Sequence, residues 1–473
     1  MVDGKVLAAR FAGAADFETR KVISGGNELE IFFLDGLTSG RDIADFIVRP
    51  LHEARQDERE ETLFTRAERG LVWCASMKEA SSTDEAAELL VNGFCVILFP
   101  KTGKALACEV KTGEKRSPSA PEAENTVKGA KDAFTETLRT NTSLIRRHLR
   151  TPELRLEESV VGRRSLTKVT VCWVEGLTDP ELPARMKKRL GEIDIDGLLS
   201  PAAVEEYVTG ARKTAFPLLE FTERTDHFCQ GLLDGQVGLL VDGLPIGYLA
   251  PVSFGRLMRS PEDRATDYLS ASMLRSLRYL ALGVSLLLPG IYAAMAMFHQ
   301  QMLPTKLLLS IVESKQDVPF STLFEVVGLL CAFELLQQAG LHLPQAIGTA
   351  VSIIGGLVVG TAAVDAKLVS PAALIVTASS GICGFTLPNR ELSDALRLWR
   401  LGLTVLGGVL GLFGVTAGLL LLLIKLAGLE SLGRSYLAPF GEAEVKGALV
   451  RERLAEQKWR DGTLRPLDER NQR

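Results

Sequence analysis

The sequence lacks the clustered cysteines, the spaced histidines and the excess of positive charge on which several common protein classes depend. Its seven cysteines stand singly, with no CxxC pair, so it predicts neither a disulfide framework nor a zinc site. The five histidines show no spacing typical of metal ligands. A formal net charge of -4 over 473 residues gives no electrostatic basis for binding nucleic acid.

Signatures of catalysis and of secretion are missing as well. The sequence contains neither a GxxxxGK[ST] loop nor a GxSxG motif, so we expect no cofactor and predict that the protein is not an enzyme. Residues Met1–Arg20 lack a basic start followed by an apolar run. No secretory signal is therefore predicted, and the N-terminal half is expected to lie in the cytoplasm.

Charged side chains are scarce in one continuous part of the chain. Residues 277–427 carry only 15 charges, about one residue in ten, whereas the rest of the chain carries about three in ten. About 20 apolar residues cross the hydrocarbon core of a membrane as a helix. The sequence therefore predicts an integral membrane protein with about five spans, at Leu277–Phe298, Pro319–Leu336, Ile347–Val364, Leu368–Leu387 and Leu401–Ile424.

The N-terminal half alternates strand-like and helix-like patterns, and its strands recur at a nearly constant offset. LEIFFLDGL at Leu29–Leu37 resembles VTVCWVEGL at Val169–Leu177, 140 residues later. The strand pair at 92–98 and 104–110 recurs 142 residues later, at 234–240 and 246–252. These matches favour a duplicated α/β subdomain, the alternative being chance similarity of short apolar strands.

These patterns together predict an α+β membrane protein. Two tandem α/β cytoplasmic subdomains are followed by an α-helical transmembrane domain and a polar C-terminal tail. The predicted boundaries are 1–130 and 131–270 for the two subdomains, 271–430 for the transmembrane domain and 431–473 for the tail.

The topology of the spans stays open at this point. Arg390, Arg397 and Arg400 precede the last apolar run, which favours a cytoplasmic loop there. A fifth full crossing would then place the Arg-rich tail outside, against the positive-inside rule. Either the second apolar run does not fully span, or the tail lies too far from the bilayer to influence the orientation.

Two acidic residues lie inside the second apolar run. Glu325 and Glu334 are nine positions apart, which places them on opposite faces of a helix. A carboxylate at membrane depth is costly unless it faces protein or water, so both are candidate functional residues. The alternative for each is a structural hydrogen bond to a neighbouring helix.

The third apolar run has one face of small, weakly polar side chains. Its members are Thr349, Ser352, Gly356, Val359 and Ala363. In a symmetric oligomer this face could line a pore, with Val359 as an apolar constriction that excludes water. Ordinary close packing of helices explains small residues equally well.

One further candidate lies in the segment FTETLRTNTSLIRR, Phe134–Arg147, where Asn141 shares the apolar face of a predicted helix. A buried Asn there more often satisfies backbone groups of a neighbouring turn than it binds a ligand.

With these residues laid out, the chain resembles the A subunit of the GerA family of spore germination receptors over about Phe17 to Pro439. Each motif is weak alone, but their order along the chain is highly specific. Besides FTETLRTNTSLIRR, the motifs are TERTD (222–226), VDGLP (241–245), SPED (260–263), LPGIYAAMAMFHQQMLPTKLL (288–308), VPFSTLFE (318–325), FELLQQAG (333–340), SIIGGLVVGTAAV (352–364), LVSP (368–371) and YLAP (436–439).

The resemblance implies a cytoplasmic region of two α/β subdomains and a location in the inner spore membrane. It also implies a homo-oligomer in the lipid bilayer, a permease-like B subunit that binds the germinant, and a lipoprotein C subunit. Within the motifs it marks structural positions, namely Asn141, Glu223, Arg224, Asp226 and Asp242. The chain departs from the family pattern at Thr225, Gln337, Gln338 and Thr361, and a stage V sporulation paralogue with the same fold is an alternative.

The leading hypothesis is a membrane subunit of a spore germinant receptor that forms or gates a channel for monovalent cations. A secondary transporter of a small solute is the second hypothesis. A membrane-anchored signalling scaffold that conducts nothing is the third.

Overall fold

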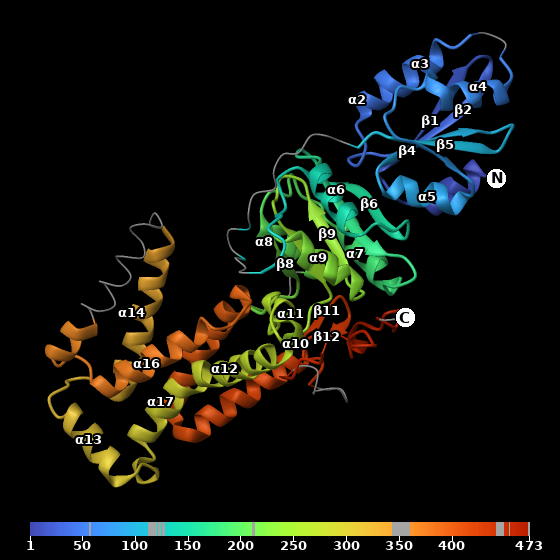
Figure 1. The fold of residues 1–473 in the computed structure, drawn as a ribbon. Coiled ribbons are helices and arrows are strands. Elements are labelled where there is room, and N and C mark those ends of the chain that lie inside the picture. The colour runs from blue at the N-terminus through green and yellow to red at the C-terminus, as the bar shows by residue number, and fades with distance from the viewer. Residues whose placement is uncertain are drawn as a thin grey trace.

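The computed structural model describes residues 1–55, 58–111, 121, 124, 128–210, 213–342, 360–440, 449–453 and 455–471 (Figure 1). Two five-stranded antiparallel sheets occupy the N-terminal half, and long helices occupy most of the C-terminal half. The final residues return to the second sheet, so the C-terminus lies far from the outer ends of the helices (Figure 1).

The first sheet has the strand order β1-β2-β4-β5-β3. Its apolar side chains are buried on both faces, because helices cover each face. The strands are β1 (Phe17–Ser24), β2 (Asn27–Leu34), β3 (Met77–Ala80), β4 (Phe94–Phe99) and β5 (Lys104–Glu109). Helices α1 (Gly4–Arg10) and α5 (Thr83–Val91) cover one face; α2 (Gly40–Asp42), η1 (Ile43–Val48), α3 (Arg49–His52), α4 (Glu60–Arg66) and η2 (Ala67–Leu71) lie on the other side.

The second sheet has the order β6-β7-β9-β10-β8. It too is buried between helices on both faces. The strands are β6 (Leu154–Val161), β7 (Thr167–Val174), β8 (Glu220–Thr222), β9 (Val237–Val241) and β10 (Gly247–Ala250). Helices α6 (Leu138–His148) and α9 (Thr225–Leu233) cover one face, and α7 (Glu181–Gly191) and α8 (Pro201–Thr209) cover the other.

The predicted duplication is confirmed by the positions of the strands. The two runs that begin at Leu29 and Val169 fall in β2 and β7, which are second in their respective sheets. The two repeated pairs fall in β4 and β5 and in β9 and β10, which are third and fourth. We call each sheet with its covering helices the first and the second sheet unit.

A buried ion pair joins the two sheet units. Arg146 of α6 donates from Nε to Asp16 Oδ2 at 2.7 Å and from Nη2 to Asp16 Oδ1 at 2.9 Å. The two side chains are 1% and 2% exposed. Close by, Ala15 N donates to Leu156 O at 2.8 Å, so main-chain contact reinforces the ion pair.

The helical half begins with two short helices and continues in longer ones. Three described helices are long and apolar enough to cross a membrane: Tyr268–Met297, Thr322–Ala339 and Arg390–Ala427. The elements are α10 (Phe254–Leu257), α11 (Glu262–Ala265), α12 (Tyr268–Met297), η3 (Gln300–Met302), α13 (Thr305–Lys315), α14 (Thr322–His342), α16 (Pro371–Gly384) and α17 (Arg390–Ala427).

The five predicted spans are matched only in part. Most of the third run lies outside the described residues, and the fourth corresponds to α16, which has 14 residues. The fifth was expected to be a single crossing. The structure instead folds this run back on itself within α17.

The reversal occurs at Gly411, whose φ of 66° and ψ of -152° are not helical. Lys425 Nζ lies 5.8 Å from the centroid of the Trp399 ring, so the two halves of α17 are antiparallel neighbours. A Cβ atom on Gly418 would lie 2.5 Å from Leu403 Cδ2. Glycines thus permit both the turn, through a positive φ, and the close approach of the two halves.

This reversal settles where the tail lies relative to the sheets. The chain leaves α17 beside the second sheet unit and forms a hairpin of β11 (Glu430–Ser431) and β12 (Arg434–Ser435). Ser431 Oγ donates to Leu218 O at 2.6 Å and accepts from Val252 N at 3.0 Å. Farther on, Leu467 N donates to Leu177 O at 2.8 Å, after the short turn η4 (Gly462–Leu464). The tail therefore packs on the same side of the long helices as the second sheet unit.

Candidate functional site

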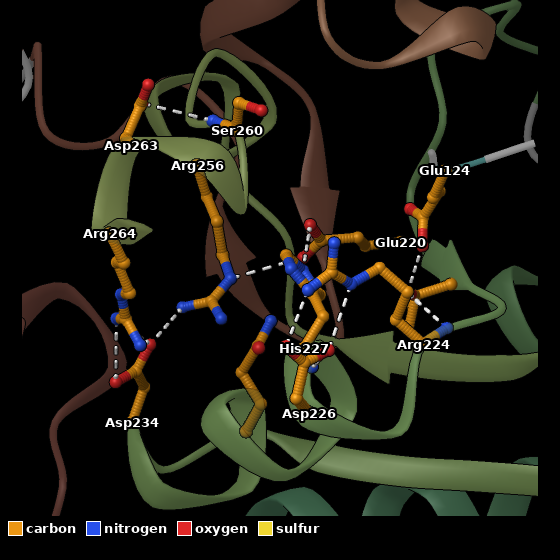
Figure 2. A network of polar contacts seen from close by, with 12 residues as sticks. Glu124, Glu220, Arg224, Asp226, His227, Asp234, Arg256, Ser260, Asp263 and Arg264 are labelled. Carbon is orange, nitrogen blue, oxygen red and sulfur yellow. Dashed lines mark hydrogen bonds and ion pairs between the residues drawn. The ribbon is translucent and has the colours of Figure 1, made fainter. Parts of the chain in front are cut away.

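A network of charged side chains fills the region between the second sheet unit and the start of α12, and Figure 2 shows its part around Arg256. We call it the junction network. Its members come from β8, α9 and the loop after α9, from α10 and α11, and from the first turns of α12. They are Glu220, Arg224, Asp226, His227, Asp234, Arg256, Asp263, Arg264, Arg275 and Arg278.

Arg256 of α10 stands at the centre of the network. Its Nε donates to Glu220 Oε2 at 3.2 Å, and its Nη1 donates to Asp234 Oδ2 at 3.0 Å. The Arg256 side chain is only 10% exposed. One guanidinium thus holds an edge strand of the sheet and the loop after α9 against the segment that leads into α12.

The electrostatics of the two carboxylates follow from this arrangement. Burial opposes the ionisation of Glu220, but the charges and hydrogen bonds of His227 and Arg256 outweigh it and lower the pKa of Glu220 to about 2. His227 Nε2 lies 3.0 Å from Glu220 Oε1. Burial also opposes ionisation of Asp234, and Arg256 and Arg264 outweigh it and lower its pKa. Both acids therefore contribute fixed negative charge at neutral pH.

A second group of charges lies at the start of α12, and the two groups are joined through the consecutive residues Asp263 and Arg264 of α11. Asp263 of α11 accepts from Arg278 Nη1 at 2.8 Å and pairs with Arg275 Nη2 at 3.4 Å. Its carboxylate also accepts from Ser260 N at 3.2 Å. The tail also contacts α12, because Arg451 N donates to Ser272 Oγ at 3.0 Å. The first turns of α12 are therefore held both by ion pairs with Asp263 and by a hydrogen bond with the tail.

Two of the family-motif residues lie in the junction network and a third lies beside it. Arg224 donates from Nε to Asp226 Oδ1 at 2.9 Å and from Nη2 to Asp226 Oδ2 at 2.5 Å, a two-pronged ion pair at the start of α9. Thr225, which lies between Arg224 and Asp226, is one of the positions at which the chain departs from the family pattern. Its hydroxyl donates to the Asp132 carboxylate at 2.5 Å. Glu223 contributes its carbonyl oxygen, which accepts from Phe134 N at 2.8 Å.

Asn141 and Asp242 shape the entry into α6. Asn141 Oδ1 accepts from Thr135 N at 2.7 Å, and Asn141 Nδ2 donates to Thr135 O at 2.6 Å. Asp242 Oδ1 accepts from Leu138 N at 3.0 Å. Asn141 thus satisfies main-chain groups of the turn before the helix, and Asp242 satisfies the first N–H of the helix itself, which has no partner within the helix.

Glu334 on α14 is held by two arginines of α17. Its Oε1 accepts from Arg400 Nη2 at 2.8 Å, and its Oε2 accepts from Arg397 Nη1 at 3.3 Å. The sequence places both arginines in a loop before the last span, and this prediction is wrong, because both lie within the first half of α17. They neutralise the carboxylate inside a region of apolar helices.

Glu325 has different partners at the other end of α14. Its Oε2 accepts from Ser370 N at 3.1 Å and from Ser370 Oγ at 2.8 Å, just before α16 begins. Lys315 Nζ lies 3.3 Å from Glu325 Oε1. This carboxylate thus links α13, α14 and α16.

Four of the five residues predicted to line a pore lie outside the described residues: Thr349, Ser352, Gly356 and Val359. Ala363 is described; it lies in a short helical segment and is half-buried. In the part of the chain that the structure describes, no group of three His, Cys, Asp or Glu side chains is arranged to hold a metal ion.

Comparison with known proteins decides the family. The sequence profile described as Bacillus/Clostridium GerA spore germination protein matches residues 5–463. The chain belongs to the GerA family. Among relatives, it is 35% identical to the "uncharacterized membrane protein YfkQ" of Bacillus subtilis (strain 168), covering 89% of this chain and 82% of that protein. It is 34% identical to spore germination protein KA of the same strain, covering 89% and 78%.

A solved structure is also similar to this GerA-family chain. It is the N-terminal domain of the A subunit of the Bacillus megaterium spore germinant receptor GerK3. It is 25% identical, with a TM-score of 0.42, and the match covers 53% of this chain and 93% of that domain. The family resemblance predicted from the ordered motifs is thus confirmed by the profile and the relatives.

The central residues of the junction network were not found from the sequence. Glu220, His227, Asp234 and Arg256 belong to no recognisable spacing pattern, because the fold brings them together from separate elements. One signal was available: Arg256 is a single charge within the apolar stretch PVSFGRLM, where a buried cation needs acidic partners.

Proposed function

We propose that this GerA-family chain is the A subunit of a germinant receptor in the inner spore membrane and acts as a homo-oligomer. In this proposal the oligomer forms or gates a path for monovalent cations that opens on nutrient sensing. A permease-like B subunit that binds the germinant and a lipoprotein C subunit complete the complex. Family membership supports the subunit role, and the three long apolar helices support a membrane location.

The observation that carries the proposal is the junction network. A movement of the second sheet unit relative to the long helices has to strain the contacts that Arg256 makes with Glu220 and Asp234. Asp234 also pairs with Arg264, and the residue before Arg264 in α11, Asp263, pairs with Arg275 and Arg278 on α12 itself. A sensing event at the sheets thus has a continuous physical route to α12.

We further propose that the sheet units and the tail lie on the cytoplasmic side. The division into 1–130, 131–270, 271–430 and 431–473 is part of this proposal. The reversal at Gly411 supports it, because it lets the Arg-rich tail return to the side of the sheets. A cytoplasmic tail agrees with the positive-inside rule, which a single crossing of the last apolar run would oppose.

The cation path is proposed to run along the third apolar run. Side chains repeated around a symmetry axis must be small to leave a path, and the face from Thr349 to Ala363 is small except at Val359. A ring of valine side chains holds water out of a narrow pore when the channel is closed.

The test is ion leak through assembled complexes reconstituted in vesicles. Val359→Ala should give leak without nutrient, and a larger side chain at this position should block nutrient-dependent flow. Val409→Ala is the matched control, because Val409 is exposed on α17 and lies outside the proposed path. Val358→Ala covers an error of one position in the register. Unchanged leak in both Val358→Ala and Val359→Ala, with assembly intact, would remove this run from the path.

A further inference from the structure

The start of α14 contains a buried carboxylate whose two oxygens are used in different ways. Glu325 lies where α13, α14 and α16 meet, in the part of the helical half far from the sheet units (Figure 1). Its Oε2 accepts from Ser370 N at 3.1 Å and from Ser370 Oγ at 2.8 Å. Its Oε1 is buried and accepts no hydrogen bond among the described residues. One oxygen is therefore fixed, and the other is available to a cation.

Ser370 holds the carboxylate from the side of α16. Its Oγ also accepts from Ala373 N at 3.3 Å, so this serine is the N-cap of α16. Glu325 is thus attached to the N-terminus of a helix, where partial positive charge favours an anion. The position of the carboxylate therefore does not depend on the group that faces Oε1.

The group that faces Oε1 is the ammonium of Lys315, the last residue of α13. Lys315 Nζ lies 3.3 Å from Glu325 Oε1 and donates to Thr322 Oγ1. Thr322 is itself buried. Hard metal cations take oxygen ligands of this kind, and an ammonium carries the same single charge as a potassium or sodium ion. The lysine therefore occupies a place that suits a free monovalent cation.

Lys315 is held less firmly than Glu325. All of α13 is described, and none of its residues is buried. The side chain of Lys315 is 25% exposed, whereas that of Glu325 is 0% exposed. A lysine ammonium also sits on a flexible four-carbon stem. Because a carboxylate buried without a counter-charge is costly, withdrawal of Lys315 favours its replacement by another cation.

We propose that Glu325 Oε1 and Thr322 Oγ1 form a binding site for a monovalent cation, which the Lys315 ammonium fills until it withdraws. A single carboxylate beside a neutral oxygen matches one positive charge, whereas calcium sites commonly use several carboxylates. A potassium or sodium ion thus competes with Lys315 for the same place. Any use of this site in conduction rests on the proposed function, but cation binding to it does not.

Chemical unfolding of the full chain in detergent micelles tests the site. Potassium or sodium chloride replaces N-methylglucamine chloride at constant ionic strength. Lys315→Met removes the ammonium and keeps an apolar stem. In this variant the ratio of folded to unfolded chain should rise about tenfold for each tenfold increase in one of the two cations, once the site is mostly filled. The unaltered chain should respond little, because its tethered ammonium has a high effective concentration.

Further variants separate this site from general effects of salt. Lys306→Met removes the other lysine of α13 and should behave as the unaltered chain does. Lys315→Met combined with Glu325→Gln removes the carboxylate charge as well, so the response to both cations should disappear. Lys315→Ala, which leaves room for a hydrated ion, carries the test if neither Lys315→Met nor the double variant folds.

Four results would overturn the proposal. Lys315→Met could respond to neither cation, or it could fail to fold in every salt while the double variant folds. The response could persist in the double variant, or calcium could stabilise Lys315→Met where potassium and sodium do not. These outcomes are separate from ion leak: unchanged leak in Val358→Ala and Val359→Ala would remove the path proposed above and leave this site in place.

Discussion

The two sheet units share one strand order, but among the described residues only the second contributes to a buried network of several ion pairs. Residues of that network have counterparts 142 positions earlier, where the first unit carries Lys78, Ser82, Asp84, Glu85 and Asn92 in place of Glu220, Arg224, Asp226, His227 and Asp234. Asp84 of the first unit pairs with Arg10 in solvent, the two side chains being 73% and 42% exposed. Both units have the same fold, whereas the buried ion pairs occur at the second unit, which is the one in contact with the long helices.

The edge strands of the two sheets differ in the same way. In β3 the middle residues are exposed, whereas Glu220 and Thr222 at the ends of β8 are buried. β8 lies where the chain continues toward α12 and where the tail packs. The edge strand is therefore largely exposed in the first unit and largely buried in the second.

The largest expected effect comes from removing the central cation of the junction network. Arg256→Met leaves Glu220 and Asp234 buried without their partner, so the free energy of unfolding should fall by about 3–5 kcal/mol. Chemical unfolding of the full chain in micelles measures it. Arg10→Met is the matched change in the first unit and should cost less than about 1 kcal/mol, because its ion pair is exposed. Equal losses would erase the distinction between the units.

A smaller loss is expected at the contact between the two units. Asp16→Asn leaves the buried Arg146 guanidinium without a counter-charge while keeping one oxygen acceptor, and should cost about 3 kcal/mol. The same unfolding assay checks it. Because this ion pair is separate from the junction network, the loss should add to that of Arg256→Met in the double variant. A strongly non-additive result would indicate that the two sites form one coupled network.

Acid should act on the second unit more than on the first. The folded-state pKa of Glu220 lies near 2, below its ordinary value, so its stabilising contribution is complete above the ordinary value and disappears as the pH falls toward 2. The loss should be about 2 kcal/mol. Unfolding followed between neutral pH and about pH 3 measures it. In Glu220→Gln this part of the acid sensitivity should vanish; if it persists, another group is responsible.

The smallest effect concerns a helix cap that the first unit has and the second lacks. Ser82 Oγ accepts from Glu85 N at 3.2 Å at the start of α5, whereas Arg224 makes no such bond at the start of α9. Ser82→Ala should therefore lower stability by about 1 kcal/mol. Ser81→Ala is a nearby control and should have little effect. A loss above that of Arg256→Met would contradict the ranking.

Local patterns predicted the sheets well because strand periodicity and a repeated offset are properties of the sequence itself. The duplication was visible at Leu29 and Val169, and family membership was visible in the ordered motifs. The reversal at Gly411 was not, since a glycine in an apolar run equally suits a straight, closely packed helix. The partners of Glu334 were missed for a related reason: Arg397 and Arg400 reach it only once α14 and α17 pack together.

The central claim is that buried charge couples the second sheet unit to α12. Hydrogen exchange of the full chain in micelles tests it most directly, by comparing Arg256→Met and Arg10→Met with the unaltered chain. We predict faster exchange in the first turns of α12 for Arg256→Met, with the first sheet unit unchanged, and no change in α12 for Arg10→Met. If Arg256→Met speeds exchange only within the second sheet while α12 keeps its protection, the network stabilises the sheet alone and the claim is contradicted.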